Sequence, residues 1–215
     1  MDEIEIAKQL RKPEGEAGKK VAEKMNETNL HIYELTFEAM NNWENNKILE
    51  IGFGNGHFIH RIVNSFNNVS YTGIDFSETM VNEANDRNKD LIDSGVVELK
   101  NAVSNDIPYP NDTFDKILTI NTLYFWENPE KDLNEIFRVL KKDGSLYLSI
   151  RTRDRMKNLP FSKYNFNLFM PDEVQKLLER SKFKVINSFH KIEPVRIVYE
   201  KEVEIDSLCL IAKKL

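Results

Sequence analysis

Apolar residues recur along this chain with two alternating periods, and the alternation predicts the order of its strands and helices. Short apolar runs predict strands near residues 47–51, 69–75, 96–100, 114–120, 145–150, 183–192 and 200–215. Apolar positions at steps of three and four predict helices near residues 19–43, 58–66, 77–95, 129–143 and 171–180. Gly144 is expected to end the fourth of these helices. Strands that alternate with helices are typical of an α/β protein with a largely parallel sheet.

A glycine-rich turn follows the first of these strands. Ile48, Leu49 and Ile51 form a run that is typical of a strand buried on both faces, and three glycines at alternate positions come directly after it. The helical spacing that begins at Phe58 completes a strand, glycine turn and helix. Such a turn places backbone N–H groups and the positive end of a helix at the carboxyl edge of a sheet, where open α/β folds bind ligands.

Two acidic residues lie at the ends of the first two strands. Glu50 interrupts the first apolar run, and a buried carboxylate needs a partner, so we expect a cationic or hydrogen-bonding ligand beside it. Asp75 ends the second strand, 19 residues after Gly56. This is close to the spacing of about 20 at which an acidic residue accepts hydrogen bonds from ribose hydroxyls in nucleotide-binding units.

The segments ILEIGFGNG and GIDFS resemble the glycine loop and the ribose-binding acid of the class I S-adenosylmethionine-dependent methyltransferases, especially their small-molecule branch. The likeness continues through IPYPNDTFDKILTINTLYFW and EIFRVLKKDGSLYLSI, and it covers roughly residues 45–152. The resemblance implies a Rossmann-like sheet of seven strands in the order 3-2-1-4-5-7-6, with the last strand antiparallel, flanked by helices. Sequence pattern alone does not give that order.

The resemblance also implies which residues bind the cofactor, S-adenosylmethionine. Met80 is either an adenine contact or simply a core residue. Asn101 and Ala102, at the end of the third strand, stand where the family contacts the adenine ring, although the family commonly has an acid there and this segment is longer before Ile107. The expected cofactor-binding residues are Glu50, Gly52, Phe53, Gly54, Gly56, Asp75, Phe76, Met80, Asn101, Ala102 and Asn121.

The loop after the fourth strand is expected to border the methyl acceptor, because ligands sit at strand ends in this architecture. Asn121 begins this loop, and Tyr124 is the candidate catalytic residue. Its ring can form one face of the site and its hydroxyl can orient a nucleophile, although a phenol with a pKa near 10 is a poor base at neutral pH. Alternatively, Tyr124 and its aromatic neighbours only cover the end of the sheet.

Two further segments are expected to surround the site. Residues 1–44 predict a helical extension that acts as a lid, and Met25, Asn26 and Asn29 either contact the cofactor or only pack on the sheet. Residues 151–170 show no clear period, and so long a connection is unusual unless it is functional or mobile, so we interpret it as a cap inserted into the domain of residues 45–215. Its arginines, Arg151, Arg153 and Arg155, either favour an anionic acceptor or belong to a solvated loop.

Composition narrows the possible functions. The net charge of -5 and the sequence pI near 5.5 argue against a nucleic-acid binder that relies on phosphate neutralisation. The single cysteine, Cys209, excludes an internal disulfide framework, suits a reducing compartment and lies in an apolar stretch typical of a core. The first twenty residues do not resemble a secretory signal, and no apolar run is long enough to cross a bilayer. We therefore expect a cytoplasmic protein without membrane or nucleic-acid partners, monomeric or homodimeric.

Methyl transfer from a sulfonium releases a neutral thioether, so it needs alignment of the reactants rather than an acid at the leaving group. His31, His57 or Tyr124 can act as a base for acceptors that carry a proton at the reacting atom. His57 and His60 lack a third ligand nearby, so no metal site is expected. Two other functions remain open. One is a nucleoside-binding protein of the same fold without turnover. The other is an NAD(P)-dependent oxidoreductase, which the chain fits less well because the dinucleotide fingerprint GxGxxG would need glycine at the position of His57.

Overall fold

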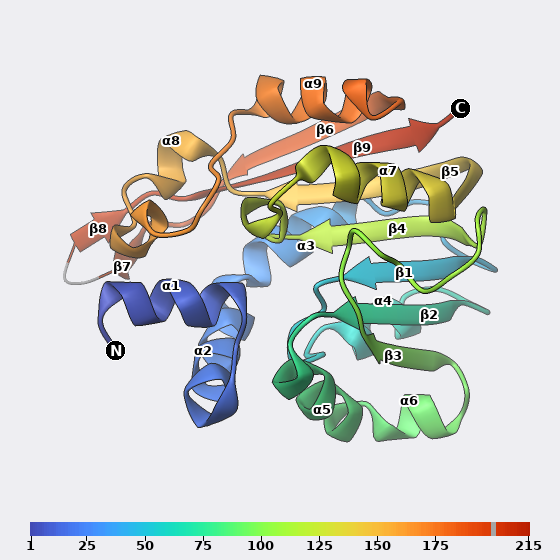
Figure 1. Cartoon of the computed structure of the whole chain (residues 1–215), viewed down its shortest axis with the longest axis horizontal. Coiled ribbons are helices and arrows are strands. Elements are labelled where there is room, and N and C mark those ends of the chain that lie inside the picture. Colours follow the sequence, from blue (N-terminus) through green and yellow to red (C-terminus); the bar gives the residue numbers. More distant parts are fainter. Residues whose placement is uncertain (199–200) are drawn as a thin grey trace.

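The computed structural model of the chain describes residues 1–198 and 201–215. Its main sheet has seven strands in the order β3-β2-β1-β4-β5-β9-β6 (Figure 1). These are β1 (Lys47–Ile51), β2 (Ser70–Asp75), β3 (Val97–Asn101), β4 (Phe114–Ile120), β5 (Leu140–Ile150), β6 (Phe183–Ile192) and β9 (Asp206–Lys214). The strand β9, the last of the seven along the chain, lies between β5 and β6 and runs antiparallel to both. The sheet order implied by the family resemblance is therefore confirmed.

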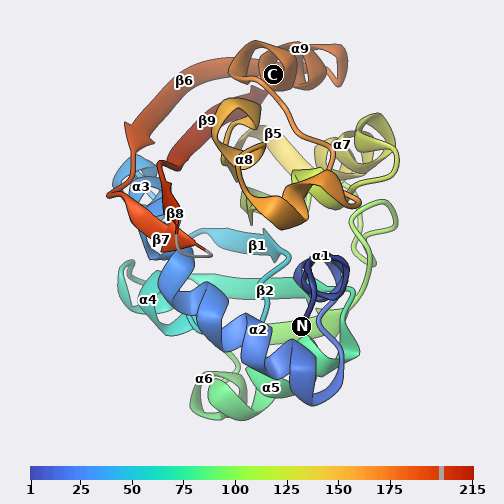
Figure 2. The same cartoon turned by 90° about the vertical axis from the view of Figure 1, so that its left-hand side faces the viewer.

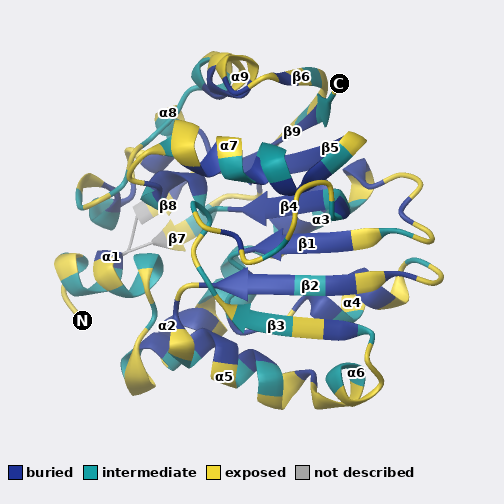
Figure 3. Ribbon diagram, turned by 45° about the vertical axis from the view of Figure 1, so that its right-hand side comes forward, coloured by how far each residue is buried: buried dark blue, intermediate teal, exposed yellow. Residues whose placement is uncertain are grey.

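Helices cover both faces of this sheet. The apolar sides of α3 (Leu30–Ala39) and α4 (Ile59–Asn64) pack on one face, and those of α7 (Pro129–Val139) and α9 (Pro171–Arg180) pack on the other. Helices α5 (Glu78–Arg87) and α6 (Lys89–Asp93) connect β2 with β3. The central strands are buried along most of their length (Figure 3), as their uninterrupted apolar runs predict.

The carboxyl edge of the sheet is surrounded by segments from both ends of the chain. In Figure 1, β1, β2 and β4 point toward the side on which α1 (Glu3–Arg11) and α2 (Gly15–Thr28) lie. The same side holds the cap segment with α8 (Arg153–Met156) and the short helix η2 (Pro160–Lys163), and the hairpin of β7 (Arg196–Val198) and β8 (Lys201–Val203), which Figure 2 shows from the front. Strand order reverses between β1 and β4, so the open crevice of this fold type lies at their carboxyl ends.

Three boundaries differ from the prediction. The helix that begins at Pro129 ends at Val139 and not at Gly144, because Leu140 pairs with Phe114 and starts β5. The N-terminal helical region is divided into α2 and α3 at Asn29, and α2 begins at Gly15. The final apolar stretch forms a hairpin strand and then β9 rather than one continuous strand.

Candidate functional site

The glycine turn between β1 and α4 has an open middle. All three glycines have positive φ, which is 79° at Gly52, 59° at Gly54 and 71° at Gly56. A Cβ on Gly52 would collide with the side chain of Thr122, and one on Gly56 would lie 2.8 Å from the Cβ of Ala84. Among the residues that the structure describes, a Cβ on Gly54 would meet no atom within 4 Å. The outer glycines are therefore required by packing, and the middle one leaves room for a ligand close to the backbone.

Asp75 joins this turn to the end of β2. Its Oδ2 accepts a hydrogen bond of 3.0 Å from the N–H of Gly54, and its Oδ1 accepts one of 2.9 Å from the N–H of Ser77. The side chain is buried, and this desolvation raises the pKa of the Asp75 carboxyl to about 6, against the opposing effect of the two N–H groups. The carboxylate thus lies at the crevice with lone pairs left for further donors.

Glu50 has protein partners that the sequence did not indicate. Its Oε1 accepts a hydrogen bond of 2.9 Å from the hydroxyl of Tyr33 in α3, and its Oε2 accepts one of 2.6 Å from the hydroxyl of Tyr71 in β2. The side chain is 1% exposed, and burial raises the pKa of the Glu50 carboxyl to about 7. A ligand is therefore not required to satisfy Glu50, and its contact with the cofactor stays a prediction. The sequence offered only one signal for these partners, namely that Tyr33 and Tyr71 stand in apolar stretches on either side of the strand that carries Glu50.

The residues expected around the adenine lie together at the ends of β2 and β3. Asn101 donates from Nδ2 to the backbone oxygen of Asp75 at 2.9 Å, and the N–H of Ala102 donates to the same oxygen at 3.1 Å. Phe76, which follows Asp75, is exposed. Met80 is fully buried in the first turn of α5, where Ser77 caps the helix by accepting a hydrogen bond of 3.2 Å from the N–H of Met80.

A second cluster of polar side chains lies at the ends of β4 and β5. Asn121, which has a φ of 58°, donates from Nδ2 to the Oδ1 of Asn29 at 3.1 Å. The same Asn29 oxygen accepts a hydrogen bond of 2.9 Å from the Nη1 of Arg151. The hydroxyl of Tyr124 donates to the Oδ1 of Asn121 at 3.1 Å. This group connects the end of α2 to two neighbouring strand ends.

The position of Tyr124 does not suit a general base. Its side chain is 2% exposed, and its hydroxyl also accepts a hydrogen bond from the backbone N–H of Arg151. Burial raises the pKa of the Tyr124 phenol well above its ordinary value. A hydroxyl that keeps its proton and is fixed by two strands can position its neighbours, and this role for Tyr124 stays a prediction.

All three cap arginines form ion pairs, and one of them is buried. Arg151 is buried and forms an ion pair of 3.0 Å with the buried Glu193. Arg153 pairs with Glu173 at 2.6 Å, and Arg155 pairs with Glu204. The surface interpretation of these arginines is therefore wrong for Arg151, whose partners lie far away in the sequence.

The remaining candidates lie outside these two groups. Asn26 donates to Glu23 on the exposed side of α2, and Met25 contacts Thr28 through its sulfur, so neither joins Asn29 at the site. His31 pairs with Glu34 within α3. Burial and the nearby Arg87 guanidinium lower the pKa of His57. Cys209 is buried as expected, and burial raises the pKa of its thiol to about 11.

Comparisons with known proteins show the family to which this fold belongs. A family model described as a methyltransferase domain matches residues 49–148. The putative methyltransferase YrhH of Bacillus subtilis is 32% identical over 121 residues, which are 56% of this chain and 66% of that protein. The uncharacterised protein MJ1123 of Methanocaldococcus jannaschii is 31% identical over 166 residues, which are 72% of this chain and 74% of that protein. The chain belongs to the class I S-adenosylmethionine-dependent methyltransferases.

One solved structure is similar to this methyltransferase over nearly its whole length. It is a complex between the Haloferax volcanii Trm112 methyltransferase activator and a putative methyltransferase, with a TM-score of 0.80 and 14% sequence identity. The match covers 98% of this chain and 97% of that one, so the likeness includes the N-terminal extension and the cap. At this identity the comparison shows the shared fold alone.

The residues of the crevice fit the cofactor that this family implies. The ribose of S-adenosylmethionine needs an acceptor for its hydroxyls, and the Asp75 carboxylate lies beside the open approach at Gly54. Asp75 has the geometry to accept hydrogen bonds from a ribose. Among the helices that the structure describes, none combines the length and the apolar character needed to cross a bilayer.

Proposed function

We propose that this protein transfers the methyl group of S-adenosylmethionine to a small-molecule acceptor by in-line displacement. The observation that carries the proposal is the contact between Gly54 and Asp75 at 3.0 Å beside an open approach to the backbone. A strand-end carboxylate tied to a glycine turn supplies both the ribose acceptor and the space for the adjoining amino-acid moiety. The remaining cofactor-binding residues are those expected from the family resemblance.

The segments around the crevice favour a small acceptor. The N-terminal helix α1 lies against the cap, and the ion pairs Glu3–Lys163 and Arg11–Glu127, both of 2.8 Å, join it to residues after β4 and β5. Beside Tyr124, the aromatic rings of Phe125, Phe161 and Phe166 form a cluster. An enclosure of this kind suits a compact molecule with apolar surface better than a macromolecule. The acidic net charge supports the same choice.

The protein's contribution to the reaction is alignment. The bound cofactor supplies an electrophilic methyl group on sulfur, whose departure as a thioether needs no proton. The polar group of Asn29, Asn121 and Tyr124 can orient the acceptor, and the cap excludes water from it. Since the Tyr124 phenol keeps its proton, acceptors whose reacting atom already has a free lone pair at neutral pH fit this site best.

Two other functions are the alternatives to this proposal. A nucleoside-binding protein without turnover would keep the same turn and the same Asp75, because fold and ligand binding do not fix activity. An NAD(P)-dependent oxidoreductase is less compatible with the chain, because the glycine fingerprint GxGxxG would need glycine where His57 stands.

The assembly of the protein is a further proposal. We expect a monomer or homodimer in the cytoplasm. The complex of the similar Haloferax volcanii methyltransferase with the Trm112 activator suggests a heterodimer with a small activator protein as an alternative. Size-exclusion chromatography coupled to light scattering, with and without such a protein from the source organism, distinguishes these states.

Calorimetric titration with S-adenosylmethionine, S-adenosylhomocysteine and NADH tests the cofactor. Binding of both sulfur compounds is expected, and tight binding of NADH alone would favour the oxidoreductase. Fractionated small-molecule extracts are then screened for release of S-adenosylhomocysteine. Cofactor binding without release in any fraction would support the function without turnover.

A further inference from the structure

Residues 102–113, here called the β3–β4 loop, connect two parallel strands without a helix. The loop starts at the carboxyl edge with Ala102, where the family resemblance predicts adenine contacts, and ends where Phe114 begins β4. An irregular segment has no hydrogen-bond ladder of its own, so its buried backbone groups need partners from elsewhere. The identity of those partners determines what fixes the loop.

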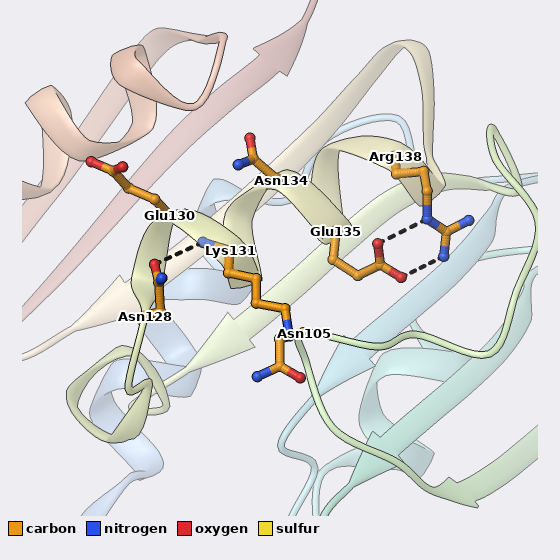
Figure 4. Close-up of a pocket in the computed structure, with 7 residues that line it drawn as sticks. All are labelled: Asn105, Asn128, Glu130, Lys131, Asn134, Glu135 and Arg138. Carbon is orange, nitrogen blue, oxygen red and sulfur yellow. Dashed lines mark hydrogen bonds and ion pairs between the residues drawn. The ribbon is translucent and has the colours of Figure 1, made fainter.

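Helix α7 provides these partners through Arg138 and Glu135. Arg138 donates from Nη2 to the backbone oxygen of Ile107 at 3.0 Å and from Nη1 to that of Tyr109 at 2.8 Å. The N–H of Ile107 donates to the Oε1 of Glu135 at 3.0 Å. Glu135 and Arg138 also pair with each other at 2.6 Å, as Figure 4 shows next to Asn105 of the loop. The ion pair therefore holds both polar groups of Ile107.

Asp132 extends the same helix face toward the carboxyl edge. It lies three residues before Glu135, so the two side chains are on one side of α7. The Oδ1 of Asp132 accepts a hydrogen bond from the hydroxyl of Ser104, and the Asp132 side chain is buried. The helix thus contacts the loop on both sides of residues 105 and 106.

The other end of the loop is tied to the ribose acid. The N–H of Ala102 donates to the backbone oxygen of Asp75, and Val103 and Asp106 form an isolated antiparallel bridge that closes a tight turn. The short segment of residues 102–106 is therefore held between Asp75 on one side and α7 on the other. Its distance from the ribose site is set by these two anchors together.

We propose that the Glu135–Arg138 pair is a positioning device for the adenine-binding part of the β3–β4 loop. This inference rests on the proposed function. The planar guanidinium reaches three loop acceptors in a fixed geometry, the two backbone oxygens and the Oδ1 of Asn111 at 3.0 Å, and a lysine cannot reproduce that arrangement. Arg138 sets the affinity for the adenosine moiety through the loop and contributes no group to methyl transfer.

Binding of adenosine and of S-adenosylhomocysteine to Arg138→Ala and Arg138→Lys tests the proposal. Arg138→Ala is expected to weaken both compounds by a similar factor of about tenfold, the scale of one lost charged hydrogen bond, and Arg138→Lys by less. With a saturating cofactor, kcat is expected to stay unchanged while KM for the cofactor rises. Arg180→Ala is the matched control. It removes an exposed ion pair of 3.2 Å between Arg180 of α9 and Glu130, which lies on α7 like Arg138. The affinity of this control variant for both compounds is expected to stay within about twofold of the wild-type affinity.

The outcomes separate this inference from the function on which it rests. Unchanged adenosine affinity in a folded Arg138→Ala variant, or a loss confined to S-adenosylhomocysteine, would overturn the positioning role alone. If Arg138→Ala does not fold, Glu135→Gln decides, because it removes the charge that pairs with Arg138, keeps an oxygen for the N–H of Ile107, and is expected to weaken adenosine binding about threefold. Wild-type affinity in Glu135→Gln would then count against the proposal. Absence of binding by the wild-type protein itself would overturn the proposed function, and this inference with it.

Discussion

The hydroxyl of Tyr33 lies 2.9 Å from the Oε1 of Glu50, so the N-terminal extension is hydrogen-bonded to the end of the first strand. The Tyr33 ring also stacks on Phe58 at a centroid distance of 3.7 Å, directly after the glycine turn. The extension is therefore joined to the residues that shape the crevice. Since Glu50 is fully buried, the two tyrosine hydroxyls are what makes its ionised form tolerable there.

Tyr33→Phe is expected to lower the free energy of unfolding by about 1 to 2 kcal/mol at pH 8, because it removes a donor from a buried carboxylate. Urea unfolding followed by circular dichroism measures this loss. Tyr109→Phe is the control, since the Tyr109 hydroxyl donates to the exposed Glu98 at 2.6 Å and water can replace it there. Equal losses in the two variants would show that burial of Glu50 does not determine the effect.

The stability of the protein without cofactor is expected to fall as the pH rises from about 4.5 to about 7. Burial raises the pKa of the Glu50 carboxyl from its ordinary value of 4.5 to about 7, so folding takes up a proton in this window. Stability is fully present below the unfolded pKa and is lost as the pH rises through the folded one, by about 3 kcal/mol for a shift of this size. Asp75 contributes in the same direction. Urea midpoints across this range are expected to vary less in Glu50→Gln, and an equally steep slope in that variant would exclude Glu50 as the cause.

Affinity for S-adenosylhomocysteine is expected to increase as the pH rises through about 6 and then to level off. Ribose hydroxyls donate to the ionised form of Asp75, whose carboxyl has a folded pKa of about 6, so protons compete with the ligand below that pH. Asp75→Ala is expected to weaken binding by about 1 to 3 kcal/mol at pH 7.5. Calorimetry between pH 5 and 8 measures both effects. Asp75→Asn keeps the shape but is expected to lose the step near pH 6, and a retained step would place the titrating group elsewhere.

The central part of this site follows from local sequence. A strand buried on both faces shows itself as an apolar run, and a turn that needs positive φ shows itself as glycine, so β1, its turn and Asp75 could be located. The order of the strands came from the family resemblance instead. That order depends on which strands pair, and pairing is not contained in the period of any one strand.

The missed features depend on contacts between distant residues. Arg151 and Asn29 are 122 positions apart, and nothing near Arg151 distinguishes a buried arginine from an exposed one. The end of α7 was misplaced for a related reason. Leu133, Ile136 and Leu140 keep helical spacing, yet Leu140 pairs with Phe114 and begins a strand. Here tertiary pairing overrides a local period.

Arg151→Leu is expected to destabilise the protein by about 3 kcal/mol or more, because it removes one partner of a buried ion pair and leaves the Glu193 carboxylate with less compensation. The nearby variant Arg155→Leu is the control. Arg155 pairs with Glu204 at a partly exposed position, so its loss is expected to be at most about 1 kcal/mol. Thermal unfolding of both variants measures the difference, and comparable shifts would mean that the buried Arg151–Glu193 pair stabilises the fold no more than a partly exposed pair does.

Gly54→Ala is expected to reduce cofactor affinity at least tenfold while stability falls by only about 1 kcal/mol. The substitution places a Cβ in the open approach to the turn, where no atom of residues 1–198 or 201–215 lies within 4 Å, so the added atom obstructs the ligand and not the fold. The residue has a φ of 59°, and the left-handed conformation costs an alanine about 1 kcal/mol. Gly95→Ala matches it closely, since Gly95 has a φ of 76° and equally free surroundings but lies between α6 and β3. It is expected to lose similar stability and to bind the cofactor normally. Calorimetric titration and urea unfolding of the two variants make the comparison, and normal binding by Gly54→Ala would mean that the ligand does not approach the turn at its middle glycine.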